Sequence, residues 1–320
     1  MTTPVEPVWR PAPHEFADSS LPTAVRVYEV GPRDGLQAES TVVPTAVKAE
    51  FCRRLVAAGV RSLEVTSFVS PKWIPQLADA DALLAELDLP GSVRQVVLTP
   101  NQRGLERALT AGAREVAVFV SATETFARKN LNTTVSGALD NARPVVEGAR
   151  AAGIGTRGYI SMCFGDPWEG WVDPRRVADI TAELTGMGCS SISLGDTIGV
   201  ATPGHIRAVL DAVQAAGVPI GSIAGHFHDT YGQALANVYA ALTAGVTEFD
   251  TAAGGLGRCP YAKGATGNLA TEDLVWMLHG LGIHTGIDLG ALTDTSRWMA
   301  GHTGHPSPSR VATALIAART

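Results

Sequence analysis

Cysteine is scarce in this 320-residue chain. The four cysteines are Cys52, Cys163, Cys189 and Cys259, and no two of them form a C-x-x-C pair. Small secreted domains that depend on disulfides have many cysteines at close spacing. The number and spread of these four therefore exclude a disulfide scaffold and favour a reducing cytosol.

Excess positive charge and long apolar runs are also missing. The net charge is −6, with 25 Lys and Arg against 31 Asp and Glu, which gives no support for nucleic-acid binding. No apolar run approaches the roughly 18 to 20 residues that span a bilayer. The first 22 residues hold five prolines and no apolar core of a signal peptide. We expect a cytoplasmic protein with no nucleic-acid or membrane partner and a flexible N-terminal arm over residues 1–24.

A short phrase with a glycine in third place recurs along the chain. It is AAGV at 57–60 and 215–218, TAGA at 110–113, AAGI at 151–154, GMGC at 186–189 and TAGV at 243–246. Glycine is favoured just past a helix end because it accepts a left-handed backbone. Each phrase therefore predicts a point where a helix ends, and most of them precede a predicted strand.

Short apolar segments alternate with helical patterns along most of the chain. The predicted strands are 25–30, 62–67, 93–98, 115–120, 157–162, 191–196, 222–228 and 247–252. The predicted helices are 44–58, 76–87, 102–111, 136–152, 174–187, 203–216, 232–244 and one that begins at Thr271. This order predicts a (β/α)8 TIM barrel over residues 25–286.

An open doubly wound sheet is the alternative fold. Its G-x-G-x-x-G motif is absent after the first strand, where the sequence is GPRDGL. Two further helices, at 289–299 and 309–318, are expected to form a C-terminal helical tail, residues 287–320, packed on the barrel.

Chemistry in such a barrel sits at the carboxyl ends of the strands. His226 and His228 end the seventh strand two residues apart, so both point to one face while Phe227 points away. The pair could share a metal or simply hydrogen-bond; the spacing leaves both open. Asp34 follows the first strand and could complete a metal site, with Asn268 as a fourth ligand. Nitrogen and oxygen ligands without thiolate favour Mg²⁺ or Mn²⁺.

Other charged residues are predicted at the same end of the barrel. Arg33 follows the first strand and could stabilise an oxyanion, or it could form a salt-bridged loop. Glu64 could pair with Arg33, because a carboxylate inside a barrel is costly unless paired. Glu29 is expected to point into the barrel, and Asp196 to lie at its mouth.

A glycine-rich segment follows the eighth strand. It has five glycines from Gly254 to Gly267 and carries Cys259. Such a segment is typical of a mobile loop over a site. Cys259 is either an acid/base group or an incidental thiol.

Together these segments resemble the 3-hydroxy-3-methylglutaryl-CoA lyase family of metal-dependent TIM-barrel enzymes. The matching stretches lie between about residues 25 and 286 and are EVGPRDGLQ, EVTSFVSPKWIPQLAD, LTPNQRG, SLGDTIGVATPG, HFHDTYGQALAN and GLGRCPYAKGATGNLATEDL. Their joint occurrence is more specific than any one motif.

The resemblance implies a carbon–carbon lyase that cleaves 3-hydroxy-3-methylglutaryl-CoA to acetyl-CoA and acetoacetate in a retro-Claisen reaction. It implies a metal held by Asp34, His226, His228 and Asn268, and a place in leucine degradation and ketone-body metabolism. Arg33 would stabilise the enolate oxygen, and Cys259 would take part in proton transfer to the enolate carbon, a role that His226 would share.

The resemblance also implies supporting residues. Glu29, Glu64 and Asp196 would be supporting carboxylates. With Arg33, the expected substrate contacts are Gln37, Ser67, Lys72, Asp166, Trp168 and Thr197. The acyl-CoA substrate is the expected partner, and a homodimer is the expected assembly.

The sequence departs from the family pattern at several positions, two of which bear on the substrate. SMCFGDPW has Asp166 and Trp168 where the family usually has Cys and Tyr, which bears on the choice of acyl group. TGHPSPSR has His305 where a basic L-G-R-type segment is common, so Lys72, Lys129 and Arg258 could contact the CoA phosphates instead. The alternatives are a lyase for a different 3-hydroxy-acyl-CoA, a condensing synthase of the same superfamily and a catalytically silent binding protein.

Overall fold

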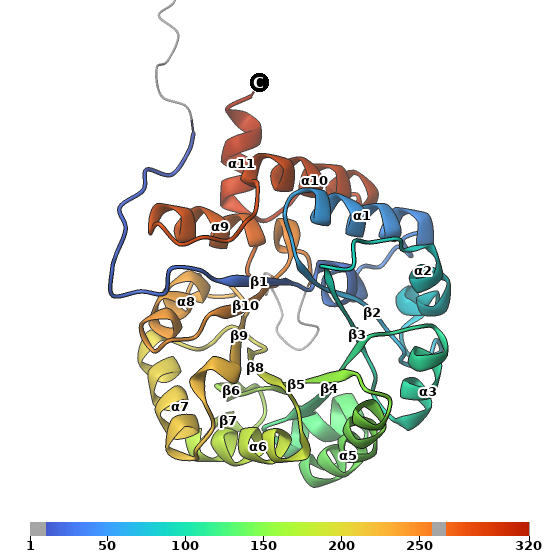
Figure 1. The fold of residues 1–320 in the computed structure, drawn as a ribbon. Coiled ribbons are helices and arrows are strands. Elements are labelled where there is room, and N and C mark those ends of the chain that lie inside the picture. Colours follow the sequence, from blue (N-terminus) through green and yellow to red (C-terminus); the bar gives the residue numbers. More distant parts are fainter. Residues whose placement is uncertain (1–10, 258–266, 320) are drawn as a thin grey trace, which may run out of the picture.

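The computed structural model describes residues 11–257 and 267–319. Eight parallel strands close into a barrel in the order β1-β10-β9-β8-β5-β4-β3-β2, with helices around them (Figure 1). The strands are β1 Arg26–Glu29, β2 Ser62–Ser67, β3 Arg94–Leu98, β4 Glu115–Ser121, β5 Gly155–Ser161, β8 Ser191–Asp196, β9 Ile223–Phe227 and β10 Glu248–Thr251. The predicted TIM barrel is confirmed.

The surrounding helices follow the strands in the chain. They are α1 Thr45–Ala57, α2 Ala80–Glu86, α3 Gln102–Thr110, α5 Val135–Ala151, α6 Pro174–Met187, α7 Pro203–Ala215, α8 Ala234–Thr243 and α9 Thr271–Gly280. The six glycines of the repeated phrase all have φ between 73° and 115°, a region that only glycine adopts without strain. The phrase therefore ends a helix at each position, as predicted.

The predicted helix at 76–87 begins later than expected, at Ala80. The side chain of Gln76 is used by the loop before α1: it accepts from the Val43 amide at 2.9 Å and donates to the Thr41 carbonyl at 3.0 Å. Several short elements at the ends of strands were not predicted. They include the helical turn η1 Gly31–Gly35, the pair α4 Glu124–Phe126 and η3 Ala127–Leu131, and the hairpin β6 Gly165–Asp166 with β7 Gly170–Trp171.

The interior of the barrel is polar, and the apolar core lies between strands and helices. Arg157 on β5 is fully buried, with its guanidinium carbon 4.1 Å from the ring centre of Tyr28 on the opposite strand β1. It contacts Glu248 and Asp250 on β10. A buried arginine is tolerated when its charge is paired in this way.

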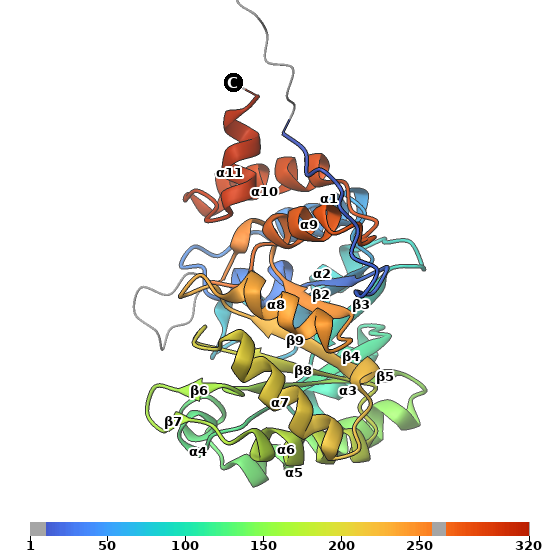
Figure 2. The ribbon, with the colours of Figure 1, turned by 90° about the vertical axis from the view of Figure 1, so that its left-hand side faces the viewer.

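The C-terminal helices α10 Leu289–Thr303 and α11 Arg310–Ala317 stack beside α1 and α9, outside the barrel (Figure 2). Asp273 on α9 accepts hydrogen bonds from the Ser309 hydroxyl and the Val311 amide. The boundaries of the arm, barrel and tail stay a prediction. Among the described residues, no helix is long and apolar enough to cross a membrane.

Candidate metal centre and active site

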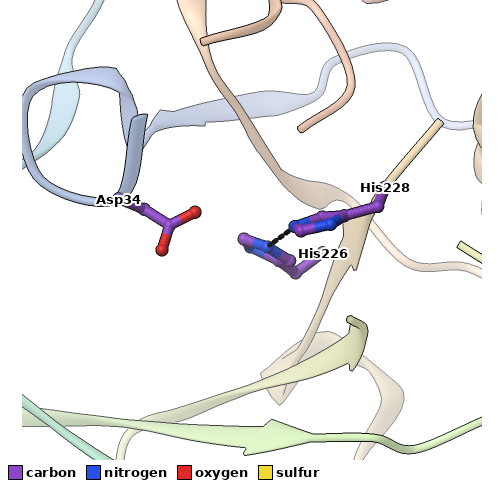
Figure 3. Close-up of side chains that lie close together, drawn as sticks. All are labelled: Asp34, His226 and His228. Carbon is purple, nitrogen blue, oxygen red and sulfur yellow. Dashed lines mark hydrogen bonds between the residues drawn. The ribbon is translucent and has the colours of Figure 1, made fainter. Parts of the chain in front are cut away.

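Three predicted ligands meet at the mouth, the carboxyl end of the barrel strands. One ligand atom from each of Asp34, His226 and His228 lies within 4.8 Å of the others. Figure 3 shows the Asp34 carboxylate facing the two imidazoles. β10 lies between β1 and β9 in the barrel, so the side chains span three adjacent strands. The predicted convergence is confirmed.

The turn η1 directs Arg33 and Asp34 into the mouth. The amides of Arg33 and Gly35 both donate to the Val30 carbonyl, at 3.2 and 3.1 Å, so the chain turns directly after β1. A Cβ on Gly31 would lie 2.5 Å from the carboxylate of Glu29. Glycine at 31 therefore permits this turn, and any larger residue would displace it.

Arg33 is buried between two carboxylates. Its Nε and Nη2 donate to Oε2 of Glu64 at 2.7 and 2.6 Å, and its Nη1 donates to Oδ1 of Asp34 at 2.9 Å. Burial alone would lower the pKa of Arg33, but Glu64 and Asp34 together raise it. The residue is a fixed cation beside the metal ligands, and its predicted pairing with Glu64 is confirmed.

Asp34 is held as a carboxylate. Burial alone would raise its pKa, but Arg33 and then His226 hold the pKa down at about 2. Asp34 is therefore ionised at neutral pH, the state in which a carboxylate binds a cation.

The two imidazoles face one another with Nε2 atoms 3.3 Å apart. Nδ1 of His226 lies 3.2 Å from Oδ2 of Asp250. Burial, and then the neighbouring His226, lower the pKa of His228 to about 4. His228 is therefore neutral at pH 7, as a metal ligand must be.

Asn268 completes the cluster. Its Nδ2 donates to Oδ2 of Asp34 at 2.8 Å and to the Leu256 carbonyl at 3.0 Å. Its Oδ1 is buried, as is Nδ1 of His228, and neither has a hydrogen-bond partner among the described residues. Buried polar atoms without a partner are rare, and both of these atom types can bind a cation.

The residues fit a divalent cation. Two ligands at right angles around an octahedral cation, with bonds of about 2.1 Å, lie roughly 3 Å apart; the two Nε2 atoms, 3.3 Å apart, satisfy this. The set is one carboxylate, two imidazoles and an amide with an unpartnered oxygen. Such a set without thiolate suits Mg²⁺ or Mn²⁺.

Glu29 does not point into the barrel, and that expectation is wrong. Tyr28 takes the interior position, and Glu29 faces the helices, where it is fully buried. It accepts hydrogen bonds from the Gly31 amide, the Ala253 amide and the Thr271 hydroxyl. Burial raises its pKa to about 7. Glu29 therefore joins η1 to both ends of the glycine-rich segment.

The next predicted residues support loops around the mouth. Asp196 accepts from the amides of Val200 and Ala201, at 2.9 and 3.0 Å, and burial raises its pKa to about 6. The hydroxyl of Thr197 accepts from the amide of Met162, a residue with a left-handed φ of 59°.

Ser67 and Asp166 are also engaged within loops. Ser67 accepts from the Val69 amide and donates to the Leu98 carbonyl. Asp166 is buried in β6, where Oδ2 accepts from the Thr123 hydroxyl and Oδ1 from the amides of Trp168 and Glu169. Asp166 therefore shapes the β6–β7 hairpin, with both carboxylate oxygens in use.

The remaining predicted contacts are more accessible. Trp168 is 43% exposed, and Nζ of Lys129 lies 5.0 Å from its ring centre. Lys72 is exposed and Gln37 is partly buried. Arg258 and Cys259 lie outside the described residues.

One residue of the site was missed by the sequence analysis. Asp250 on β10 contacts His226. The alternation of Glu248 and Asp250 about Phe249 was the available sign: two acidic residues on one face of a buried strand require partners.

The HMGL-like family model matches residues 24–299. The chain belongs to this family. A relative from Pseudomonas aeruginosa, named 3-hydroxy-3-isohexenylglutaryl-CoA/hydroxy-methylglutaryl-CoA lyase, is 49% identical over 93% of this chain and 99% of its own length. The mitochondrial hydroxymethylglutaryl-CoA lyase of Arabidopsis thaliana is 50% identical over 92% of this chain, which spans only 63% of that protein.

A solved structure agrees with these relatives. The crystal structure of hydroxymethylglutaryl-CoA lyase from Pseudomonas aeruginosa has a TM-score of 0.91 and 49% identity. The comparison covers 93% of this chain and 99% of that one. The HMGL-like family therefore accounts for both the sequence and the barrel.

Proposed function

We propose that this HMGL-like protein is a metal-dependent carbon–carbon lyase that cleaves 3-hydroxy-3-methylglutaryl-CoA to acetyl-CoA and acetoacetate. The observation that carries the proposal is the cluster of Asp34, His226 and His228 at the mouth, with the cationic Arg33 beside it. The names of the closely similar relatives support the substrate.

The cation would be held by Asp34, His226, His228 and Asn268. When bound, Mg²⁺ or Mn²⁺ would supply positive charge that lowers the pKa of the substrate hydroxyl. His228 and Asn268 are buried, whereas Asp34 and His226 are partly exposed at the mouth, so the proposed cation site is open to a substrate.

Arg33 stabilises the enolate oxygen that forms when the carbon–carbon bond breaks. Its guanidinium is held from behind by Glu64, so it need not reorganise during the reaction. When the tertiary hydroxyl loses its proton and the adjacent carbon–carbon bond breaks, the hydroxyl becomes the ketone of acetoacetate. A proton added to the enolate carbon then gives acetyl-CoA. Cys259, with His226, is proposed for this second transfer on the basis of sequence.

The other carboxylates act through the groups they hold. Glu64 positions Arg33, and Glu29 joins η1 to the backbone at Ala253. Asp196 fixes the turn after β8 through two amides. These are proposed as positioning residues, since none of the three is itself a predicted metal ligand.

The CoA substrate is proposed to lie across the mouth. Gln37, Lys72 and Trp168 have exposed surface to contact it, and Lys129 adds a positive charge beside Trp168. Ser67, Asp166 and Thr197 shape the loops that receive it, since their polar atoms are engaged within those loops.

One assay tests the function. Purified protein with Mn²⁺ or Mg²⁺ is expected to convert 3-hydroxy-3-methylglutaryl-CoA to equal amounts of acetoacetate and acetyl-CoA, and EDTA is expected to abolish this. Activity that persists in EDTA contradicts the metal mechanism. If the protein cleaves only the 3-isohexenyl analogue, the proposed substrate is wrong and the 3-hydroxy-3-isohexenylglutaryl-CoA activity in the name of the Pseudomonas relative is supported instead.

We further propose a cytoplasmic homodimer that acts in leucine degradation and ketone-body metabolism. The scarcity of cysteine supports a reducing compartment. Light scattering on the purified protein tests the assembly: a mass near twice 33.3 kDa is expected, and a monomer contradicts it.

A further inference from the structure

Asp250 contacts Nδ1 of His226, the ring nitrogen that does not face His228. It is 1% exposed, and its Oδ2 accepts from Nδ1 of His226 at 3.2 Å and from the Ser193 hydroxyl at 2.7 Å. Its Oδ1 accepts from Nη2 of Arg157 at 2.5 Å. Three donors from three different strands therefore converge on one carboxylate.

Arg157 is itself fixed, so it holds Asp250 in place. Its guanidinium carbon lies 4.1 Å from the ring centre of Tyr28 and 5.2 Å from that of Tyr159. Its Nη1 contacts the carboxylate of Glu248, two residues before Asp250 on β10. The guanidinium has little freedom to move, and neither has the carboxylate it binds.

A carboxylate fixed in this way decides which imidazole nitrogen carries the proton. Both oxygens of Asp250 already accept hydrogen bonds from Arg157 and Ser193, so the carboxylate selects the form of His226 with hydrogen on Nδ1. Nε2 of His226 then presents a lone pair toward His228 and Asp34.

The two histidines differ in this respect. Nδ1 of His228 has no hydrogen-bond partner among the described residues, whereas Nδ1 of His226 has Asp250. The ring of His226 is therefore oriented before any ligand arrives.

We propose that Asp250, held by Arg157 and Ser193, is a positioning residue that fixes the tautomer and orientation of His226 for a divalent cation. The inference rests on the proposed metal site. The competing explanation is structural: Asp250 would serve only to neutralise the buried Arg157. Glu248 separates the two explanations because it also contacts Arg157 but not His226.

The test is a titration of the metal-free protein with Mn²⁺ alone, followed by electron paramagnetic resonance. Asp250→Asn keeps the size of the side chain and removes its charge; we expect its Kd for Mn²⁺ to rise by about 10- to 100-fold. The matched control, Glu248→Gln, removes the other acidic partner of Arg157, and its Kd is expected to stay within threefold of the wild-type value. Thermal unfolding of all three proteins reports the structural cost separately.

Two results overturn the inference. One is a Kd for Asp250→Asn within threefold of the wild-type value, and the other is an equal loss in Glu248→Gln. If the wild-type protein itself binds no Mn²⁺ yet cleaves substrate, the proposed metal mechanism fails instead.

A second measurement reads the tautomer in the wild-type protein itself. Nitrogen NMR of ¹⁵N-histidine-labelled wild-type protein at pH 8, with His226→Gln used only to assign the signal, reports the tautomer directly. We expect hydrogen on Nδ1 of His226. Hydrogen on Nε2 contradicts the proposal.

Discussion

Replacing Glu64 by glutamine tests whether Arg33 needs its buried partner. Glu64 is 0% exposed and makes two contacts to the Arg33 guanidinium, at 2.7 and 2.6 Å. Removing one partner of a buried ion pair costs about 3–5 kcal/mol. We expect the lower end, about 3 kcal/mol, because the amide oxygen still accepts a hydrogen bond and Asp34 still balances part of the charge. A chain of this length loses roughly 2 °C of Tm per kcal/mol, so Tm should fall by about 6 °C.

Activity should fall as well, by a separate route. Without the charge of Glu64, Arg33 is attracted more strongly to Asp34, which it already contacts at 2.9 Å. Asp34 is then less available to a cation, and the guanidinium leaves the place where the enolate oxygen forms. We expect kcat to fall at least tenfold and the Kd for Mn²⁺ to rise. Differential scanning calorimetry, the acetoacetate assay and a metal titration measure the three effects.

Glu115→Gln is the matched control. Glu115 also makes two contacts to one arginine, Arg94, at 2.8 and 2.5 Å, but it lies at the opposite end of the barrel and is 17% exposed. We expect this partly exposed pair to contribute about 1 kcal/mol and its loss to leave kcat unchanged. If Glu64→Gln gives the same Tm and kcat as Glu115→Gln, the proposed support of Arg33 by Glu64 is wrong.

Three further changes test other parts of the proposal. Cys259→Ser should lower kcat at least tenfold with little change in KM, because a proton donor acts after binding; steady-state kinetics decide, and an unchanged kcat removes Cys259 from the mechanism. Burial raises the pKa of Glu272 to about 7, above its value in the unfolded chain. The contribution of Glu272 to stability is therefore present below about pH 4.5 and is lost as pH rises to 7. The Tm of the wild-type protein relative to that of Glu272→Gln should fall over this range, and a constant difference between the two Tm values refutes the prediction. Gly255 has a φ of 68°, and a Cβ there would lie 2.9 Å from Pro308, whereas Gly217 has a φ of 82° and open space around it. Both changes to alanine strain the backbone, but Gly255→Ala should lower Tm more than Gly217→Ala. Equal shifts in Tm contradict the close packing at Gly255.

The barrel and the meeting of Asp34 with His226 and His228 could be predicted because both follow from local sequence patterns. Glycine past each helix end marked the elements, and the two-residue spacing of His226 and His228 placed both on one face. The pairing of Glu64 with Arg33 could be predicted because an unpaired carboxylate inside a barrel is energetically costly.

The rest depended on geometry that one sequence does not contain. β1 is buried on both faces, so alternation alone could not tell whether Tyr28 or Glu29 faces the interior. The contact of Arg157 with Asp250 crosses the barrel between strands that are not neighbours, and it depends on strand tilt and stagger. Asp166 belongs to a hairpin too short to show a strand pattern.

The pairing of β1 with β10 also has a consequence for how the protein is made. Asp34 and Asn268, which are hydrogen-bonded in the finished site, lie 234 residues apart in the chain. A ribosome that adds about 5 to 20 residues per second makes Asn268 roughly 12 to 47 s after Asp34. A nascent chain therefore carries only one of the four proposed ligands, Asp34, until His226 is made, and all four can meet only after β1 has paired with β10. Because a ligand stabilises only the state that binds it, metal binding would stabilise the closed barrel and no earlier folding step.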